Sequence, residues 1–258
     1  MLAAIREIAH YRQLLFRLVG RDLRVRYKRS VLGVTWAFAE PLVLMGLFTM
    51  VFSRFLRVNT PDYPVFVLCG IVVWGFFQTG VTYALTSVSG NANLVKKIYF
   101  PREILPLATV LGRFVHFLLS LLLLVPFLVY FHAPITIALL YLPLLVALEL
   151  VLVCGLALLF TGLSTLYEDV AFLVSFAFTG LFYVSPVFYS VELVPAAIRP
   201  WYLLYPIAAL ISAYRDVLLY GKAPSVLELT TAVVAAGLCL TLGAMVFRRL
   251  QWSFAEVL

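Results

Sequence analysis

Long runs without charge are the feature that most limits how this chain can fold. No Asp, Glu, Lys or Arg occurs in residues 63–95 or in residues 114–148. A helix needs about 20 apolar residues to cross a bilayer, so the second run is too long for one helix and suits two. Of the 258 residues, 64% are hydrophobic and 12% are charged, whereas soluble domains are nearer half apolar and a quarter charged. The sequence therefore predicts an all-α integral membrane protein.

A change from basic to apolar sequence near residue 30 sets the orientation of the chain. Residues 21–29 are rich in Arg and Lys, and an apolar run follows from about 31 to 53. Lys and Arg beside a spanning helix stay on the cytoplasmic side. From Arg6 to Lys28 polar residues recur at steps of three and four, which is typical of an amphipathic helix lying in the membrane interface. A soluble helix that packs on a partner is the alternative. The net charge of +7 is concentrated here, which favours a membrane surface over nucleic acid.

We expect six spanning helices in one transmembrane domain at residues 30–250, preceded by an interfacial helix at 1–29 and followed by a cytoplasmic tail at 251–258. The expected spans are about 31–53, 64–88, 104–131, 135–163, 170–189 and 227–247. Both ends of the chain then lie in the cytoplasm, and the inner segments carry more Lys and Arg than the outer ones. Residues 192–219 contain three prolines and an apolar piece too short to span, which predicts short re-entrant helices on the outer face.

Nothing in the sequence indicates catalysis or a metal site. The three histidines lie on different segments, and the three cysteines stand alone in apolar stretches, where they are interpreted as packing residues. The phosphate-binding pattern Gly-x-x-x-x-Gly-Lys-Ser/Thr is absent. The chain is therefore expected to be no enzyme and to hold no cofactor, and energy for active transport would come from another subunit.

The loop after the second span is the most informative local motif. Ile98, Tyr99 and Phe100 follow Lys96 and Lys97 on the cytoplasmic side. Three bulky apolar residues in a row suit a helix that docks on a soluble partner. A helix end resting on lipid suits them equally, because Tyr and Lys are also enriched at that depth.

Three motifs, in order, carry a family resemblance. They are Arg21-Asp-Leu-x-x-Arg-Tyr-x-x-Ser-x-Leu-Gly-x-x-Trp36, Leu94-Val-Lys-Lys-Ile-Tyr-Phe-Pro-Arg-Glu-Ile-Leu-Pro106 and the ending Phe254-Ala-Glu-Val257. Over nearly its whole length the chain resembles the permeases of type-2 export ABC transporters, most of all the O-antigen polysaccharide exporters (Wzm-type). Teichoic acid and capsular polysaccharide exporters share the motifs. A membrane-embedded transferase acting on lipid-linked sugars and an ion-coupled carrier are alternatives from other classes.

The resemblance implies an assembly and a substrate. It implies a homodimer in the inner membrane, joined to two ATPase subunits that hold ATP and Mg²⁺, and an undecaprenyl-linked polysaccharide that moves outward. It also implies that the first inner loop, residues 91–103, couples the permease to the ATPase. The second inner loop, at Tyr167-Glu-Asp169, is our next candidate for coupling. The coupling residues are Asn93, Lys96, Lys97, Ile98, Tyr99, Phe100, Pro101, Arg102, Tyr167, Glu168 and Asp169.

The short outer helices of the family act as a gate. The resemblance implies a gate at residues 192–219 of this chain, and the predicted gate residues are Arg199, Trp201, Tyr205, Pro206 and Arg215. The family often has Asn-Pro where this chain has Tyr205-Pro206, which leaves the details of the gate open.

Aromatic residues crowd the first, second and fifth spans. Flat apolar faces with polar edges can hold sugar rings, although core packing and interfacial belts explain most aromatics in any membrane protein. A carboxylate inside lipid normally faces a cavity or a partner, and Arg113 is a candidate counter-ion for Glu40. The predicted channel residues are Trp36, Phe38, Glu40, Phe76, Phe77, Phe172, Phe176 and Tyr183.

Overall fold

The computed structural model describes residues 10–27, 33–55, 57 and 60–254, and within them regular structure is entirely helical, as predicted. The α-helices are α2 (Arg12–Tyr27), α3 (Trp36–Phe48), α4 (Tyr63–Ala84), α5 (Ala92–Lys97), α6 (Ile104–Tyr130), α7 (Leu142–Leu166), α8 (Asp169–Val184), α9 (Arg199–Tyr202), α10 (Pro206–Leu218) and α11 (Val226–Leu250). Short helical pieces are η1 (Gly33–Thr35), the π-helical η2 (Thr49–Phe55), η3 (Ser89–Asn91), η4 (Ile137–Tyr141), η5 (Val191–Leu193) and η6 (Gln251–Ser253). The first part of the expected interfacial helix and most of the expected tail lie outside the described residues.

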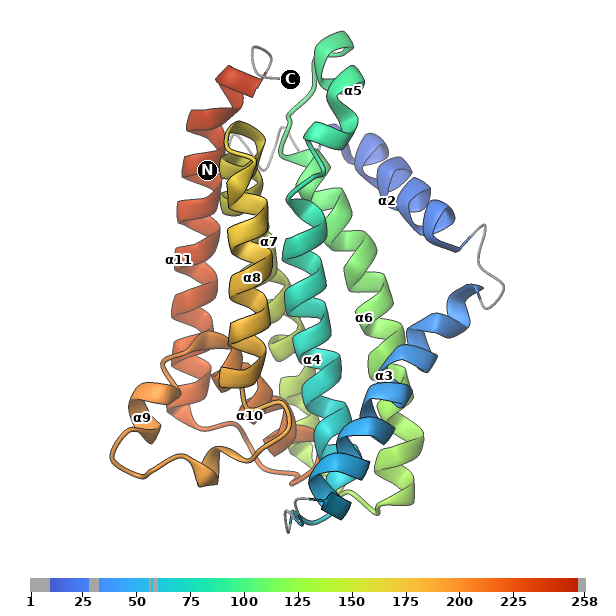
Figure 1. The fold of residues 1–258 in the computed structure, drawn as a ribbon, viewed down its shortest axis with the longest axis vertical. Coiled ribbons are helices and arrows are strands. Elements are labelled where there is room, and N and C mark those ends of the chain that lie inside the picture. The colour runs from blue at the N-terminus through green and yellow to red at the C-terminus, as the bar shows by residue number, and fades with distance from the viewer. Residues whose placement is uncertain (1–9, 28–32, 56, 58–59, 255–258) are drawn as a thin grey trace.

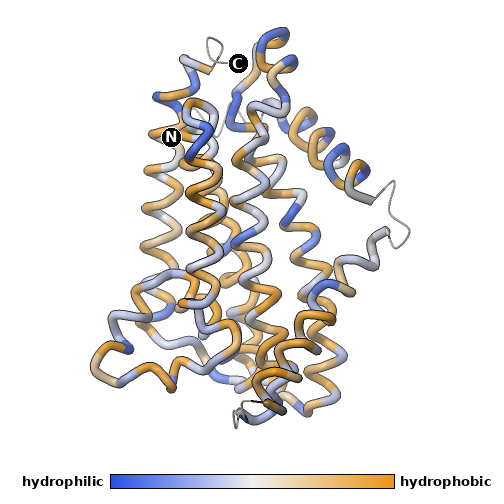
Figure 2. The backbone as a smooth tube through the Cα atoms, in the orientation of Figure 1, coloured by the Kyte–Doolittle hydropathy of each residue, from blue (hydrophilic) through white to orange (hydrophobic). Residues whose placement is uncertain are grey.

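The long helices form an upright bundle with different elements at its two ends. In Figure 1, α2, α5 and the last turns of α11 lie at the upper end, and α9 and α10 lie at the lower end. Five helices in the described ranges are long and apolar enough to cross a membrane, namely Trp36–Ser53, Tyr63–Ala84, Ile104–Tyr130, Ile137–Leu166 and Val226–Ser253. The apolar helix α8 is shorter, with 16 residues. Figure 2 shows hydrophobic shafts along most of these helices and hydrophilic stretches at the upper end.

The centre of the bundle is α4. Its residues are almost uniformly apolar, so the helix has no polar face that would lie against solvent. Most of its side chains are buried. It packs against α3, α6, α7, α8 and α10. Other helices therefore take their positions around α4.

Helices α7 and α11 pack with their backbones in direct contact. A Cβ atom placed on Gly243 would lie 2.0 Å from the carbonyl oxygen of Gly155, and one on Gly155 would lie 2.4 Å from the backbone of Cys239. Glycine at both positions lets the two backbones touch, which is how helices commonly pack in membranes.

Local sequence explains where two helices begin or end. Ser225 and Glu228 form a reciprocal capping box at the start of α11. The helix α8 ends at Val184, before the predicted end near 189. Ser185 precedes Pro186 and has extended backbone angles (φ −77°, ψ 146°), because a residue before proline is disfavoured in a helix.

Candidate functional site

The first inner loop, residues 91–103, turns its apolar residues in two directions. Helix α5 ends at Lys97, and Ile98 is extended (ψ 134°). Tyr99 is 80% exposed, whereas Phe100, its neighbour, is 4% exposed. Ile98 is also exposed. The exposed apolar tip of the loop is therefore Ile98 with Tyr99, and Phe100 belongs to the permease core.

Contacts with the end of α11 hold this loop in place. Phe100 lies in a buried cluster that also contains Phe247 and Phe254. The carboxylate of Glu103 accepts a hydrogen bond from Nε of Arg248 at 3.1 Å, and the two form an ion pair. The Arg102 guanidinium donates to the carbonyl of Gln251. A groove of about 530 Å³ lies between the loop and these residues, and its rim includes Lys96, Lys97, Pro101 and the exposed Trp252.

The remaining coupling candidates do not line this groove. Tyr167, Glu168 and Asp169 form the exposed turn between α7 and α8. Asn93 is exposed on α5. Helix α5 and the turn from α7 to α8 are at the upper end of the bundle in Figure 1. The structure thus brings Lys96–Arg102 together with α11 and leaves the second inner turn separate.

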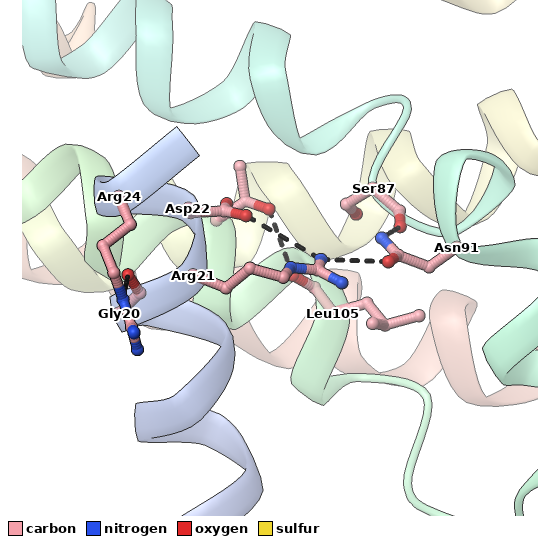
Figure 3. A network of polar contacts seen from close by, with 8 residues as sticks. Gly20, Arg21, Asp22, Arg24, Ser87, Asn91 and Leu105 are labelled. Atoms are coloured by element: carbon pink, nitrogen blue, oxygen red, sulfur yellow. Dashed lines mark hydrogen bonds and ion pairs between the residues drawn. The ribbon is translucent and has the colours of Figure 1, made fainter. Parts of the chain in front are cut away.

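A polar junction joins α2 to the start of the first inner loop. Figure 3 shows Arg21 between Asp22 and Asn91. A guanidinium nitrogen of Arg21 donates to the side-chain oxygen of Asn91 at 2.9 Å and lies 3.8 Å from the Asp22 carboxylate. The Asn91 amide in turn donates to the carbonyl of Ser87 at 2.7 Å. These contacts position α2 against the segment that follows the C-terminal end of α4.

A cavity of about 1070 Å³ lies between α2, α3, α4, α6 and α8, and we call it the central cavity. Four predicted channel residues line it: Trp36, Glu40, Phe76 and Tyr183. Its other polar lining residues include Arg21, Asp22, Gln78, Thr79, Asn91, Arg113 and His116. The cavity therefore combines aromatic walls with both signs of charge.

The other predicted channel residues lie elsewhere. Phe77 is buried and packs on Phe178, with ring centroids 5.2 Å apart. Phe172 and Phe176 are exposed on α8 and do not line the cavity. Phe38 is partly buried on α3. Phe76 lines the cavity with little exposed area because its ring stacks on Phe117 at 4.8 Å.

Arg113 and Glu40 line the same cavity but form no ion pair with each other. The Arg113 guanidinium instead lies 3.2 Å from the centre of the Tyr83 ring. Gln78 and Thr79 also line this cavity, although they were not predicted as channel residues from the sequence. The sequence does contain a sign of Gln78, because it is the only amide side chain in residues 63–84.

Arg215, a predicted gate residue, is buried inside the bundle. Its guanidinium donates to the carbonyls of Pro186 at 2.6 Å, Val187 at 2.7 Å and Phe66 at 3.2 Å. A Cβ on Gly70 would lie 2.8 Å from this guanidinium, so the site has no room for a larger residue. Arg215 therefore joins α10 to α4 and to the segment that follows α8.

The other predicted gate residues lie at the lower end of the bundle. Arg199 donates to the carbonyls of Glu192 and Val194, which closes the turn before α9. Trp201 is exposed, and Pro206 is the first residue of α10. Burial raises the pKa of Tyr205 to about 12, so this phenol stays neutral, and it accepts a hydrogen bond from Ser185 at 3.3 Å.

Comparison with known proteins identifies the family. The model of the ABC-2 type transporter family matches residues 13–219. The chain belongs to this family. The chain is 32% identical to an O-antigen export system permease protein RfbA of Klebsiella pneumoniae, over 95% of both chains. It is 28% identical to an RfbA of the same description from Myxococcus xanthus, over 99% of both. It is 22% identical to the polysialic acid transport protein KpsM of Escherichia coli, over 88% of this chain and 90% of the relative.

Proposed function

We propose that this ABC-2 permease exports a lipid-linked polysaccharide across the inner membrane, with O-antigen as the first candidate substrate. The observation that carries the proposal is the end-to-end match to two permeases named for O-antigen export. A match over 95–99% of both chains includes the inner loops, the cavity and the outer helices, not a single shared motif.

The ATPase is proposed to be a separate subunit, present twice beside two copies of this chain. The chain lacks a phosphate-binding loop, so ATP and Mg²⁺ would be held by that partner. We propose that Ile98 and Tyr99 dock on it, because they are the exposed large apolar residues of the loop, whereas Phe100 is buried. The ion pair of Glu103 with Arg248 would carry a movement of the loop to α6 and α11.

The glycan path is proposed to follow α3 and α8. Trp36, Glu40 and Tyr183 from these helices line the central cavity, and Phe172 and Phe176 continue along an uncovered face of α8. In a dimer such faces could meet around a shared channel. Aromatic faces bind sugar rings without fixing one orientation, which suits a moving polymer.

Six spans with both termini in the cytoplasm are proposed, with α8 as the fifth. Its 16 residues give about 24 Å at 1.5 Å per residue, somewhat less than the bilayer core of about 30 Å. Its lower end packs on the outer end of α3 through Phe182 and Phe48, 5.9 Å apart. The basic residues of α2, α5 and α11 at the opposite end favour the cytoplasm there. On this topology α9 and α10 are short re-entrant helices on the outer face.

Export in cells tests the proposal. The chain and its ATPase would be expressed in a strain that lacks its own O-antigen permease and ATPase but still makes the lipid-linked polymer. Surface polysaccharide should reappear only with both subunits present, and the purified pair should contain two copies of each. Surface polysaccharide from the permease alone, or ATP hydrolysis by the permease alone, would contradict the proposal.

Capsular polysaccharide is the second candidate substrate, favoured by the match to KpsM. The same plasmids in a capsule-export mutant separate the two substrates. Restored capsule without restored O-antigen would replace the first assignment by the second.

A further inference from the structure

We propose that the central cavity binds the phosphate-bearing head of the lipid carrier, with the phosphate on Arg113 and the first sugar deeper in the cavity. The inference rests on the proposed function, because it assumes a lipid-linked substrate. It adds a binding site and its chemistry. The recognised group is a phosphate or diphosphate ester attached to a sugar.

The register of α3 against α6 shows that the cavity is long and has two different ends. The hydroxyl of Ser120 donates to the carbonyl of Ala37 at 3.1 Å, which fixes where α3 meets α6. Arg113 precedes Ser120 by seven residues and so lies about 10 Å nearer the α2 end. Glu40 follows Ala37 by three residues and lies toward the opposite end. The cation and the carboxylate are therefore at separate depths.

The upper end of the cavity has the chemistry of a phosphate site. In the part of the chain that the structure describes, no carboxylate pairs with Arg113, whose recorded contact is the face of Tyr83. A ring contact occupies the face of a guanidinium and leaves its N–H edge available. A planar fork of donors matches phosphate oxygens, and a cation at this depth is costly without an anion. Arg21 lines the same end, between Asn91 and the Asp22 carboxylate, which lies 3.8 Å from it and also lines the cavity.

The deeper part of the cavity suits a sugar. Gln78 accepts a hydrogen bond from the indole of Trp74 at 3.0 Å, and its amide nitrogen has no partner among the described residues. Thr79 donates to the carbonyl of Gly75, so its oxygen is still available as an acceptor. The Glu40 carboxylate can accept from hydroxyl groups. Sugars present hydroxyls in a ring and an apolar face, which these polar groups and the neighbouring aromatic walls can match.

The volume supports a head group and not a lone ion. Sites for small organic ligands usually measure about 300–1,000 Å³, and this cavity, at about 1070 Å³, is slightly larger. A single inorganic phosphate would leave most of it unfilled. A ligand that carries an anion and a sugar on one molecule would fill both chemically different ends.

Binding to the assembled permease–ATPase complex in lipid nanodiscs tests the site. The probes are undecaprenyl diphosphate, undecaprenol, which lacks phosphate, and inorganic diphosphate, which lacks lipid. Arg113→Gln should weaken binding of undecaprenyl diphosphate by about tenfold or more, because a charge-assisted hydrogen bond is lost, and should leave undecaprenol binding unchanged. Arg113→Lys keeps the charge without the fork and should give an intermediate affinity. The matched control is Arg17→Gln, an exposed cation on α2 that does not line the cavity.

Several results would overturn the proposal. Equal affinity of wild type and Arg113→Gln would exclude Arg113 as the phosphate ligand. An equal loss in Arg17→Gln, or equal competition by phosphatidylglycerol, would indicate only a basic membrane surface. Tight binding of inorganic diphosphate would indicate a free-phosphate site. If wild type restores export while Arg113→Gln binds the carrier normally, this site is wrong and the proposed function stands. If wild type fails to restore export of any polysaccharide, the proposed function itself fails.

Discussion

The pair α7–α11 and the pair α3–α8 are built on opposite principles. The first pair packs backbone against backbone at Gly155 and Gly243, where no side chain fits. In α3 only Ala37 and Pro41 are buried among the described side chains, and in α8 only Val174 and Phe178. The central cavity lies against α3 and α8, not between α7 and α11. The tightly packed pair α7–α11 is therefore the rigid part of the bundle, which we call the frame. Helices α3 and α8, with few buried side chains, can line the proposed glycan path or contact a second copy of the chain.

The largest effect is expected inside the frame, from Gly243→Ala. The added methyl would lie 2.0 Å from a backbone oxygen, so the helices must separate along their length. Overpacking typically costs about 1–3 kcal/mol and more where backbone cannot yield, so we expect about 3 kcal/mol or more and little protein in the membrane. Gly237→Ala on the same helix is the control, because nothing lies within 4 Å of its added methyl. Normal thermal stability of Gly243→Ala in detergent would contradict the tight α7–α11 contact.

Two phenylalanines of α8 have opposite surroundings: Phe178 packs inside the bundle, and Phe176 is exposed. Phe178 is 4% exposed and packs on Trp74 and Phe77, so Phe178→Ala should cost about 3 kcal/mol. Phe176 is 80% exposed, so Phe176→Ala should change thermal stability by less than about 0.5 kcal/mol while reducing polysaccharide export. Thermal unfolding scored beside surface polysaccharide distinguishes the two. Normal export by Phe176→Ala would remove this face of α8 from the proposed path.

A partly buried carboxyl near the end of α10, Asp216, gives a prediction that depends on pH. Burial, with Glu228 nearby, raises the pKa of Asp216 to about 6 from its ordinary value of 3.8. Because the pKa of Asp216 is higher in the folded state than in the unfolded state, the protonated carboxyl favours folding. Its contribution to the free energy of unfolding is fully present below pH 4 and is lost as the pH rises through 6. We expect Asp216→Asn to stabilise the purified protein at pH 7 by about 1–3 kcal/mol, at 1.36 kcal/mol per pKa unit, and to have little effect at pH 4. The same gain at both pH values would mean that charge burial is not its cause.

The sequence predicted the helices better than it predicted which side chains face one another. The uncharged runs located α4 and α6, because a lipid-spanning helix must be apolar over its whole length. Phe100 was grouped with Tyr99, but the chain is extended after α5, and neighbouring residues of an extended chain point to opposite sides. Arg215 was predicted as a gate residue without its carbonyl partners Phe66 and Pro186, which are distant in sequence. Such contacts need the tertiary structure.

The smallest effect on stability, with a large effect on assembly, is expected at the tip of the first inner loop. Tyr99 is exposed, so Tyr99→Ala should leave thermal stability within about 0.5 kcal/mol of wild type. If Tyr99 docks on the ATPase, the variant should lose the ATPase on an affinity column or hydrolyse ATP without export. Phe100→Ala is the contrast, because this ring packs with Phe247 and Phe254 inside the permease, and its loss should lower stability by about 3 kcal/mol. A loop that only rests on lipid would keep the ATPase and export normally when Tyr99 is removed. Coupling would then have to run through another surface, of which the exposed turn at Tyr167–Asp169 is the next candidate.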